Sequence, residues 1–308
     1  MHVFSIEGAS TLLNGETFLA RGLRCSNALI SDETADDLVA HLDEYAGYGV
    51  NTVSVFLMGS RFGDVKGYRE DASLSPDHAA RLGRIIEGAD QRGMVVIVGC
   101  LYWDDSRAKW NSWTQTEANA AVVNTMAFLA EHDYRNTFID VDNEGMALRA
   151  KGFDNRELVL AAKRVDGRIP VATNYHGDPP DEADLAIHHS NRAPGKPYIE
   201  SEGSPPNAPG GYWGEYSKRE GLYGYLNVGV YTDEVKQAQI VAAAQHYDRG
   251  EGYLFASTWL QAPPPQGPNT DPGGDGSTAQ PGVRWWLQWL KERFGAYQAV
   301  GSAAAVNQ

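Results

Sequence analysis

The sequence predicts an α/β fold in which residues 1–308 form a single (β/α)8 TIM barrel. Eight strand-like segments alternate with helical or loop segments along the chain. The length of 308 residues is typical of one such barrel. A doubly wound open sheet is disfavoured, because no glycine-rich phosphate-binding turn follows the first strand.

The N-terminal residues 1–17 predict a β-hairpin that precedes the barrel. The dipeptide Asn14-Gly15 is a strong signal for a two-residue hairpin turn. The apolar segment 18–23 follows it as the first barrel strand and leads into the polar residues Arg24, Ser26 and Asn27.

The first half of the barrel continues with regular alternation. Leu38 and Leu42 recur at helical spacing, and Pro76 suits the first turn of a helix. The segment 93–99 is almost wholly apolar, which is typical of a strand covered on both faces. The sequence therefore predicts helices at 32–45 (capped by Asp32 or Thr34), 75–91 and 117–131 (capped by Thr116), and strands at 51–58, 93–99 and 138–143.

The second half completes the count of eight strands. Only a short helix or loop precedes the sixth strand. Residues 261–281 are rich in Pro, Gly and Asp and predict a loop between the last strand and the last helix, and residues 301–308 predict a frayed tail. The remaining predicted strands are 170–174, 185–189, 198–202 and 253–259, and the remaining helices are 156–164, 233–249 and 283–294.

Composition limits the classes of partner. The formal charge of −14 and the lack of a Lys/Arg cluster disfavour a nucleic-acid or anionic-membrane partner. No apolar run is long enough to span a bilayer. Cys25 and Cys100 lie in apolar strand-like runs and are expected to be buried free thiols. Met1 is not followed by a signal-peptide pattern, so the chain is expected to be cytoplasmic or the mature form of an exported protein; monomer and homodimer stay open.

The carboxyl ends of the strands carry the chemistry. In barrels of this class these ends meet in one bowl. Carboxylates, amide and imidazole groups and aromatic faces would meet there, and these are the groups that a sugar needs. The residues placed in the bowl are Arg24, Ser26, Asn27, Met58 to Arg61, Tyr102 to Asp104, Asn143, Glu144, Asn174 to His176, His188 to Asn191, Glu200, Glu202 and Trp259.

Two of the carboxylates close strands. Glu144 ends the fourth strand and Glu202 the seventh, which predicts paired carboxylate chemistry. Glu200 shares a strand face with Glu202, but Glu202 is nearer the rim and is preferred. Asp140 and Asp142 share the parity of Glu144 and could either tune its pKa or pair with arginines.

At this point the chain resembles the clan A retaining glycoside hydrolases, the (β/α)8 superfamily of cellulases, β-mannanases and β-galactosidases. The resemblance lies in the hairpin LLNGETFLARGL, in Asn143-Glu144 at the fourth strand, in KPYIESEG at the seventh and in Trp259 at the eighth. It implies that the hairpin closes the barrel floor. It also implies that Glu144 is the acid/base, Asn143 the ligand of the sugar 2-hydroxyl, Glu202 the nucleophile and Trp259 an aromatic platform.

The resemblance further implies hydrolysis of a β-linked oligo- or polysaccharide with retention and without a cofactor. Many members carry an arginine near the second strand, a place that Arg24 or Arg61 would have to fill here. The loop tryptophans Trp103, Trp110, Trp113 and Trp213 suit an exposed stacking surface, whereas Trp285, Trp286 and Trp289 suit the core. The other expected substrate contacts are His188, Asn27, Trp103, Tyr175 and Arg24.

Two rival interpretations remain from the sequence. His176, His188 or His189 with acidic residues such as Asp178 could form a metal-dependent hydrolase site. Neighbouring residues of a strand face opposite ways, however, which disfavours one metal shared by His188 and His189. The other rival is a catalytically silent sugar-binding barrel, because a fold does not prove an activity.

Overall fold

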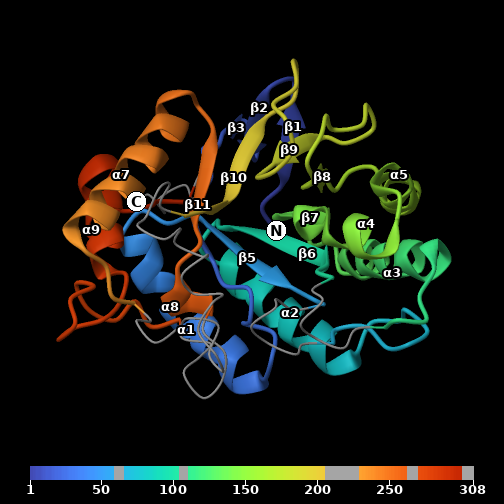
Figure 1. The fold of residues 1–308 in the computed structure, drawn as a ribbon, viewed down its shortest axis with the longest axis horizontal. Helices are drawn as coiled ribbons and strands as arrows, with labels where there is room; N and C mark the ends of the chain where they lie inside the picture. The colour runs from blue at the N-terminus through green and yellow to red at the C-terminus, as the bar shows by residue number, and fades with distance from the viewer. Residues whose placement is uncertain (59–65, 104–109, 205–228, 262–269, 300–308) are drawn as a thin grey trace, which may run out of the picture.

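The computed structural model describes residues 1–58, 66–103, 110–204, 229–261 and 270–299. Eight parallel strands close into a barrel in the order β10-β11-β4-β5-β6-β7-β8-β9, which confirms the predicted fold class (Figure 1). The strands are β4 (Arg21–Arg24), β5 (Thr52–Phe56), β6 (Val95–Leu101), β7 (Thr137–Asp142), β8 (Val171–Thr173), β9 (Leu185–Ile187), β10 (Tyr198–Gly203) and β11 (Gly252–Phe255).

Helices cover much of the outside of the barrel (Figure 1). They are α1 (Asp32–Gly47), α2 (Pro76–Asp90), α3 (Gln115–Glu131), α5 (Asn155–Val165), α7 (Asp233–Asp248) and α9 (Arg284–Phe294). Two short helices, α4 (Met146–Lys151) and α8 (Thr258–Gln261), follow the ends of β7 and β11. The described connections from β8 to β9 and from β9 to β10 hold no helix, in line with the short connection predicted before the sixth strand.

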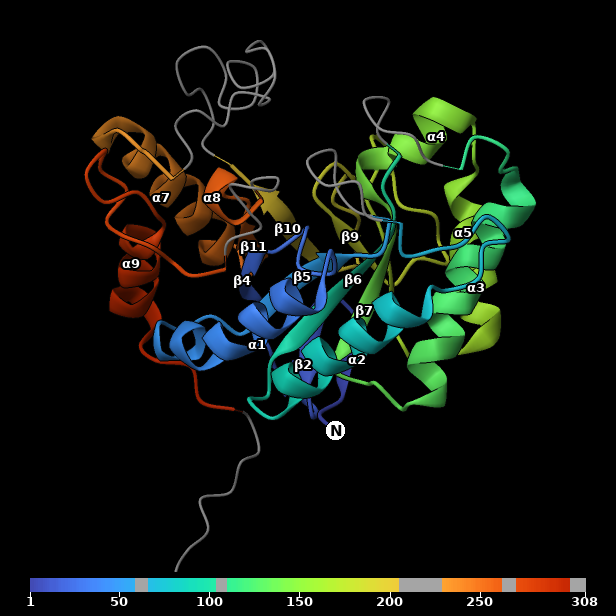
Figure 2. The same cartoon turned by 90° about the horizontal axis from the view of Figure 1, so that it is seen from below.

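The N-terminal segment forms a separate antiparallel sheet of β1 (Phe4–Glu7), β2 (Ser10–Leu13) and β3 (Glu16–Thr17). The predicted turn is present between β2 and β3, where Asn14 and Gly15 both have positive φ angles of 54° and 82°. The Phe4 ring stacks on Phe138 of β7 at 5.2 Å. Figure 2 shows the N-terminus and β2 at the end of the molecule opposite α4. The hairpin therefore closes one end of the barrel, and the bowl lies at the other.

The core has two apolar layers. One fills the barrel interior and its floor and includes Phe4, Ile97 and Phe138; the other lies between strands and helices and includes Val96 and Ile139. Alternate residues of one strand thus enter opposite layers. Because both faces of β6 are covered, this strand is apolar throughout, as predicted. On the last helix, Trp286 is fully buried, and Trp285 and Trp289 pack against the core.

The structure corrects two helix starts. Helix α1 is capped by Ser31, whose hydroxyl accepts from the Thr34 amide, and α3 is capped by Thr114 in a reciprocal pairing with Glu117. The predictions of Asp32 or Thr34 and of Thr116 as caps were wrong. In both cases Ser or Thr three residues before a polar partner completes a capping box, and that spacing decides the start.

The last strand is shorter than predicted. β11 ends at Phe255, and Trp259 lies in α8 instead of closing the strand. Gln261, the first residue of the predicted loop, instead ends α8. Within the described part of that loop, 270–281, Gly273 forms an isolated β-bridge with Gly282, the residue that follows the loop. Arg61, Trp213 and the predicted tail 301–308 lie outside the described residues. Among the described helices, none is long and apolar enough to cross a membrane.

Gly99 of β6 tests how tightly the barrel packs under the bowl. A Cβ at this position would lie 2.0 Å from Cδ1 of Phe56, the ring that supports Arg24. We expect Gly99→Ala to lower the free energy of unfolding by about 3 kcal/mol, because the ring has to move. Gly47→Ala is the matched control, since a Cβ there meets nothing within 4 Å and should stabilise α1 by up to about 1 kcal/mol. Equal urea midpoints for the two variants would contradict the described packing.

Candidate active site

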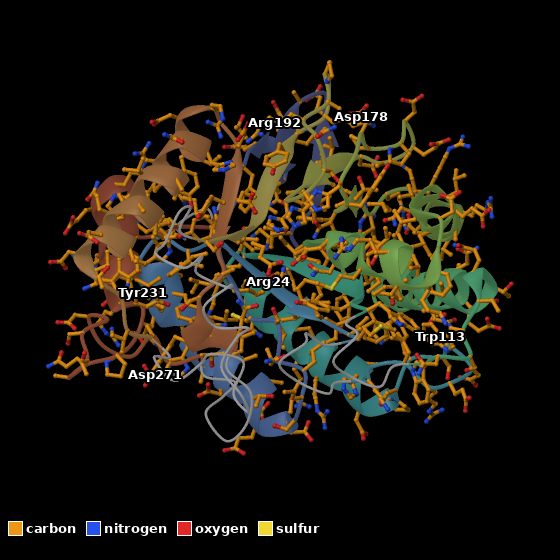
Figure 3. All side chains as sticks on the ribbon, in the orientation of Figure 1. Arg24, Trp113, Asp178, Arg192, Tyr231 and Asp271 are labelled. Carbon is orange, nitrogen blue, oxygen red and sulfur yellow. The ribbon has the colours of Figure 1, made fainter. Side chains whose placement is uncertain are left out.

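The bowl is organised around Arg24, which lies near the middle of the ribbon in Figure 3. Arg24 is fully buried at the end of β4. Its Nη2 lies 3.0 Å from Glu202 Oε2 and donates to Asn143 Oδ1 at 3.0 Å. Its guanidinium sits 4.4 Å from the centre of the Phe56 ring. The ends of β4, β7 and β10 are therefore joined through one cation.

The Glu144 and Glu202 carboxyl groups lie close enough for the charge of one to act on the pKa of the other. Two carboxyl groups that interact in this way titrate as a pair, in two steps. Burial and the Glu144 charge raise the pKa of Glu202 to about 7, against the opposing pull of Arg24. Burial opposes ionisation of Glu144, but His189, His188 and Arg24 outweigh it and lower the pKa of that carboxyl to about 2. The pair therefore holds one proton in the neutral range. Arg24 favours the negative charge on Glu202, whereas His189 Nε2, 3.6 Å from Glu144 Oε2, favours it on Glu144.

The chain after β7 presents Glu144 through an unusual backbone. Residues Asn143–Gly145 form a 3₁₀ turn in which Glu144 and Gly145 have φ angles of 53° and 63°. For a non-glycine residue this conformation costs about 1–2 kcal/mol. A Cβ on Gly145 would lie 2.7 Å from Tyr175 Cβ, so glycine is required there. Strain of this kind persists where the surrounding structure imposes it, often at functional sites.

Asp142 supports this turn. Its carboxylate accepts from the amides of Ala147 at 2.8 Å and Leu148 at 3.0 Å and from Asn155 Nδ2 at 3.0 Å. Burial nevertheless raises its pKa to about 6. Asp142 therefore anchors the start of α4, and it makes no ion pair with an arginine of the described ranges.

Asp140 lies one step deeper and accepts from Asn174 Nδ2 at 3.1 Å. Burial raises its pKa to about 7, although the Arg24 charge acts in the opposite direction. It makes no ion pair among the described residues. Of the two roles open to Asp140 and Asp142, pairing with arginine is thus not observed in the part of the chain that the structure describes.

Glu200 is engaged by a histidine. Its Oε1 lies 2.6 Å from His188 Nδ1, and both side chains are mostly buried. Burial opposes protonation of His188, but the Glu200 charge outweighs it and raises the pKa of His188 to about 9. Burial likewise opposes ionisation of Glu200, yet His188 lowers the pKa of that carboxyl to about 2. Glu200 is therefore held in an ion pair, whereas Glu202 faces Glu144.

This ion pair should make stability depend on pH. The raised His188 pKa contributes stability that is full below pH 6.5 and is lost as the pH rises through about 9. The lowered Glu200 pKa contributes stability that is full above pH 4.5 and is lost as the pH falls through about 2. We expect Glu200→Gln to lower the free energy of unfolding by about 3 kcal/mol between pH 4.5 and pH 6.5, and by less at pH 9.5. Chemical unfolding of the wild type and the variant at pH 5.5 and pH 9.5 measures this. A larger loss of stability at pH 9.5 than at pH 5.5 would contradict the ion pair.

His188 and His189 do not face opposite ways, so that prediction was wrong. β9 ends at Ile187 and His188 has a φ of 46°, so strand alternation does not extend to these residues. Their rings stack with centroids 3.9 Å apart, and His176 stacks on His189 at 4.1 Å. The turn made by His188 replaces the strand geometry that the prediction assumed.

The stack limits the metal interpretation. Ligand atoms of Glu144, His188 and His189 lie within 4.8 Å of one another, the one such group in the described part of the chain. The rings of His188 and His189 are tilted by only 29°, so their in-plane lone pairs run side by side and do not converge on one point. Asp178 lies outside the group and accepts from Asn191 Nδ2 at 2.8 Å.

Of the four loop tryptophans expected to form an exposed aromatic surface, the three that the structure describes are buried or partly buried. Trp103 and Trp113 are only 5% and 2% exposed, and Trp103 packs edge-on against Phe153. The prediction that these tryptophans form an exposed stacking surface was therefore wrong. Figure 3 places Trp113 at the periphery, away from Arg24. Trp110 is partly buried and donates to the Tyr68 carbonyl at 3.0 Å.

The other residues expected to contact the substrate differ in their exposure to solvent. Trp259 is partly exposed, donates from Nε1 to the Asp271 carbonyl at 2.6 Å and lies against Gly229. Tyr175 is partly exposed and donates to the Asp178 carbonyl at 2.6 Å. Asn27 is fully buried and donates to the Gln261 carbonyl at 3.0 Å.

One member of the Arg24 network was missed by the sequence reasoning. Gln261 is fully buried, and its Oε1 accepts from Arg24 Nε at 3.1 Å. Its place at the start of a Pro/Gly-rich segment indicated a loop, and only the helical turn of α8 brings it to the bowl. No local signal in the sequence distinguishes it from the other glutamines.

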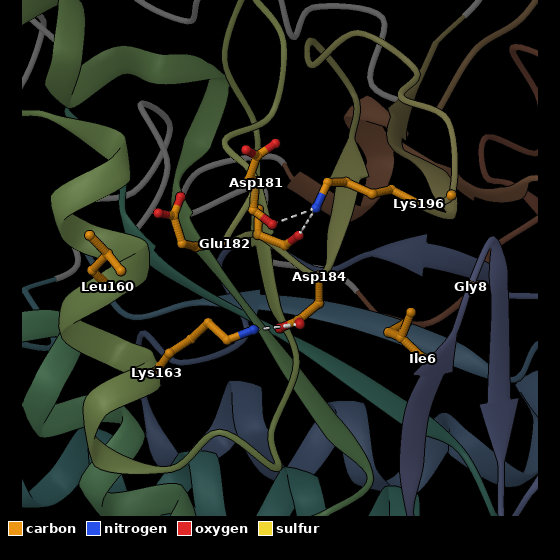
Figure 4. A pocket seen from close by; sticks show the side chains of 10 residues that line it. Ile6, Gly8, Leu160, Lys163, Asp181, Glu182, Asp184 and Lys196 are labelled. Atoms are coloured by element: carbon orange, nitrogen blue, oxygen red, sulfur yellow. Dashed lines mark hydrogen bonds and ion pairs between the residues drawn. The ribbon is translucent and has the colours of Figure 1, made fainter.

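A surface pocket of about 380 Å³ lies elsewhere, between β1, α5 and the loops before β9 and β10 (Figure 4). Both of its lysines have partners in the pocket lining. Lys163 lies 2.6 Å from Asp184, and Lys196 donates to the carbonyls of Asp181 and Ala183. None of the carboxylates predicted to be catalytic lines it.

Comparisons with known proteins identify the fold. No protein-family model matches the sequence, and no curated protein matches it. The structure is similar to an exo-β-1,4-mannosidase from an Opitutaceae bacterium, with TM-score 0.59, 14% identity and coverage of 94% of this chain and 62% of that one. A glycoside hydrolase family 5 mannosidase from Rhizomucor miehei gives TM-score 0.57, 10% identity and coverage of 94% and 96%.

A glycoside hydrolase family 5 protein from Bacteroides vulgatus gives TM-score 0.55, 16% identity and coverage of 82% of this chain and 62% of that one. The chain thus spans less than two thirds of two of these three proteins and nearly all of the other. The predicted resemblance is confirmed for the fold: the chain has the parallel (β/α)8 barrel found in glycoside hydrolases of family 5, a clan A family.

Proposed function

We propose that the chain is a retaining glycoside hydrolase that cleaves β-linked oligo- or polysaccharides, with Glu144 as acid/base and Glu202 as nucleophile. The observation that carries this proposal is that Arg24 Nη2 contacts both Glu202 and Asn143, the residue before Glu144, so the two carboxyl groups share one buried site. Retaining enzymes place their carboxyls roughly 5–5.5 Å apart, and inverting enzymes about 6.5–9.5 Å apart to admit a water. The proposed retention of configuration requires the closer arrangement.

Arg24 supports the division of roles. It is a buried, permanent charge 3.0 Å from Glu202, whereas the histidine nearest Glu144 lies at 3.6 Å and is 30% exposed. The buried charge acts more strongly, because water screens it less. In the reactive state Glu202 is then the carboxylate and Glu144 carries the shared proton for the leaving group. In the substrate-free pair the balance is the reverse, because burial raises the pKa of Glu202 and the histidines lower that of Glu144.

The reaction follows in two steps. Glu202 attacks the anomeric carbon while Glu144 gives its proton to the glycosidic oxygen, so one C–O bond forms and another breaks. The negative charge of Glu202 is consumed, which lowers the proton affinity of Glu144 and leaves it ionised as a base. Glu144 then takes a proton from water, and the hydroxide displaces Glu202.

Asn143 has a donor available for the sugar. Its Oδ1 accepts from Arg24 and from Asn174 Nδ2 at 3.3 Å, which fixes the amide orientation. Its buried Nδ2 has no partner among the described residues. An unpartnered buried donor is costly, so a substrate hydroxyl at this place would relieve it. This supports Asn143 as a ligand of the sugar, while Trp259 and Tyr175 are partly exposed candidates for ring contacts.

A substrate screen with a pH series tests the proposal. Two of the structural neighbours are described as mannosidases, so aryl β-mannosides and β-glucosides come first, followed by β-linked polysaccharides. We expect kcat/KM to fall as the pH rises through about 7, because the pair then loses its shared proton. A rate that stays constant to pH 9 would argue against a protonated acid.

Two controls separate the rival functions. Activity that survives EDTA removes the metal-dependent hydrolase, which would use His188 and His189. A protein that binds glycans but whose turnover is absent, and unchanged by Glu144→Gln or Glu202→Gln, would be the silent sugar-binding barrel.

A further inference from the structure

Gln261 at the end of α8 makes a closed set of hydrogen bonds around its side-chain amide. Oε1 accepts from Arg24 Nε at 3.1 Å and from Ser26 Oγ at 2.8 Å. Nε2 donates to the Ser257 carbonyl at 3.3 Å. Two donors meet Oε1 and one carbonyl meets Nε2, so a flipped amide would oppose donor to donor at Arg24. The orientation of the amide is therefore set by its neighbours.

The position of the Arg24 guanidinium depends on this amide. The Phe56 ring, 4.4 Å from the guanidinium carbon, supports the group but makes no directional bond to its N–H donors. The hydrogen bond from Nε to Gln261 is directional and limits rotation of the guanidinium. Because the guanidinium is rigid and planar, a fixed Nε also fixes Nη2, which meets Glu202 and Asn143 at 3.0 Å each.

We propose that Gln261 is a positioning residue for the nucleophile: it holds Arg24 so that Nη2 stays directed at Glu202. The proposal rests on the proposed function, in which Glu202 attacks the sugar, and it adds a residue that touches neither substrate nor carboxylate. The β11–α8 connection thereby controls chemistry at the end of β10.

Two substitutions and one control test this. Gln261→Met keeps the approximate volume but removes the acceptor for Arg24 Nε. Gln261→Glu keeps that acceptor and adds a negative charge that competes with Glu202 for Arg24. Gln288→Met is the matched control, because Gln288 is exposed on α9 and bonds only to Glu292 among the described residues.

We expect Gln261→Met to lower kcat by about 10- to 100-fold while KM changes by less than about threefold, since a misplaced nucleophile slows the chemical step. The acidic limb of kcat/KM should move to higher pH in both Gln261 variants, and farther in Gln261→Glu. The groups that face Arg24 are Glu202, Glu144, Asp140 and Tyr102, and those that face Glu202 are Arg24, Glu144 and His188. A Gln261→Met enzyme with wild-type kcat and an unmoved limb would overturn the proposal, and so would a loss of stability alone.

A readout independent of activity separates this proposal from the proposed function. In ¹⁵N spectra of the whole protein, the Arg24 Nε–H should exchange slowly with water in the wild type, in Gln288→Met and in Gln261→Glu, and much faster in Gln261→Met. Unchanged exchange in Gln261→Met refutes the positioning of Arg24 whatever the activity. A wild type that cleaves no glycoside but shows this pattern would refute the glycosidase function and leave the positioning of Arg24 standing.

Discussion

Glu202→Ala is expected to lose at least about 10⁴-fold in kcat on aryl β-glycosides, because no carboxylate remains to attack the anomeric carbon. Added azide should restore turnover by entering the space left by the side chain. It attacks from the face of Glu202, so the glycosyl azide should have the anomeric configuration opposite to that of the substrate. Product analysis by NMR measures both rescue and configuration.

Glu144→Ala provides the complementary arm. With an activated leaving group the first step needs no acid, and the slow step becomes removal of the sugar from Glu202. Azide then replaces water and should give a product with the same configuration as the substrate. Exchanged configurations in the two variants would mean that the roles of Glu144 and Glu202 are reversed.

Glu200→Ala is the matched control on the same strand. Because Glu200 is paired with His188, Glu200→Ala should mainly lower the free energy of unfolding and should affect the rate of covalent attack less. If Glu200→Ala turned over aryl β-glycosides only with added azide, while Glu202→Ala did so without it, the nucleophile would be Glu200 and the proposed assignment would be wrong.

Arg24→Met is expected to abolish activity and to lower the free energy of unfolding by about 3–5 kcal/mol at neutral pH, because it leaves a buried carboxylate without its cation. In the folded variant the pKa of Glu202 should rise, so that Glu202 is protonated at neutral pH. The loss of stability should therefore grow as the pH rises above 4.5, where the unfolded chain releases a proton that the folded variant retains. Denaturant unfolding from pH 4 to pH 8 measures this slope.

Arg21→Met controls for the removal of an arginine from the same strand. Arg21 stacks on the Phe294 ring at 4.7 Å and makes no ion pair among the described residues. Its removal should cost packing energy that stays nearly constant over this pH range. Parallel slopes for the two variants would show that Glu202 does not depend on Arg24.

Several elements of the fold follow from local sequence. Asn14-Gly15 adopts the positive φ angles that its turn type needs, and the apolar run of β6 reflects burial on both faces. The errors lie where a strand or helix ends. Trp259 was predicted to lie in the last strand because its neighbours are apolar, but β11 ends at Phe255 and Trp259 belongs to α8. Hydrophobic period identifies an element, but hydrogen bonds with distant residues decide where it stops.

The sequence by itself determined the barrel, its closing hairpin and the placement of carboxylates at the ends of β7 and β10, because each depends on periodicity and order along the chain. Only the tertiary structure decided how Glu200 and Glu202 differ. Both glutamates have the same strand parity, but His188 contacts Glu200 through a left-handed backbone turn. Glu202 is instead contacted by Arg24 of β4, two strands away, which Gln261 of α8 holds in place. The charged groups around each glutamate come from other elements of the fold, so the sequence of β10 alone could not predict which glutamate each of them contacts.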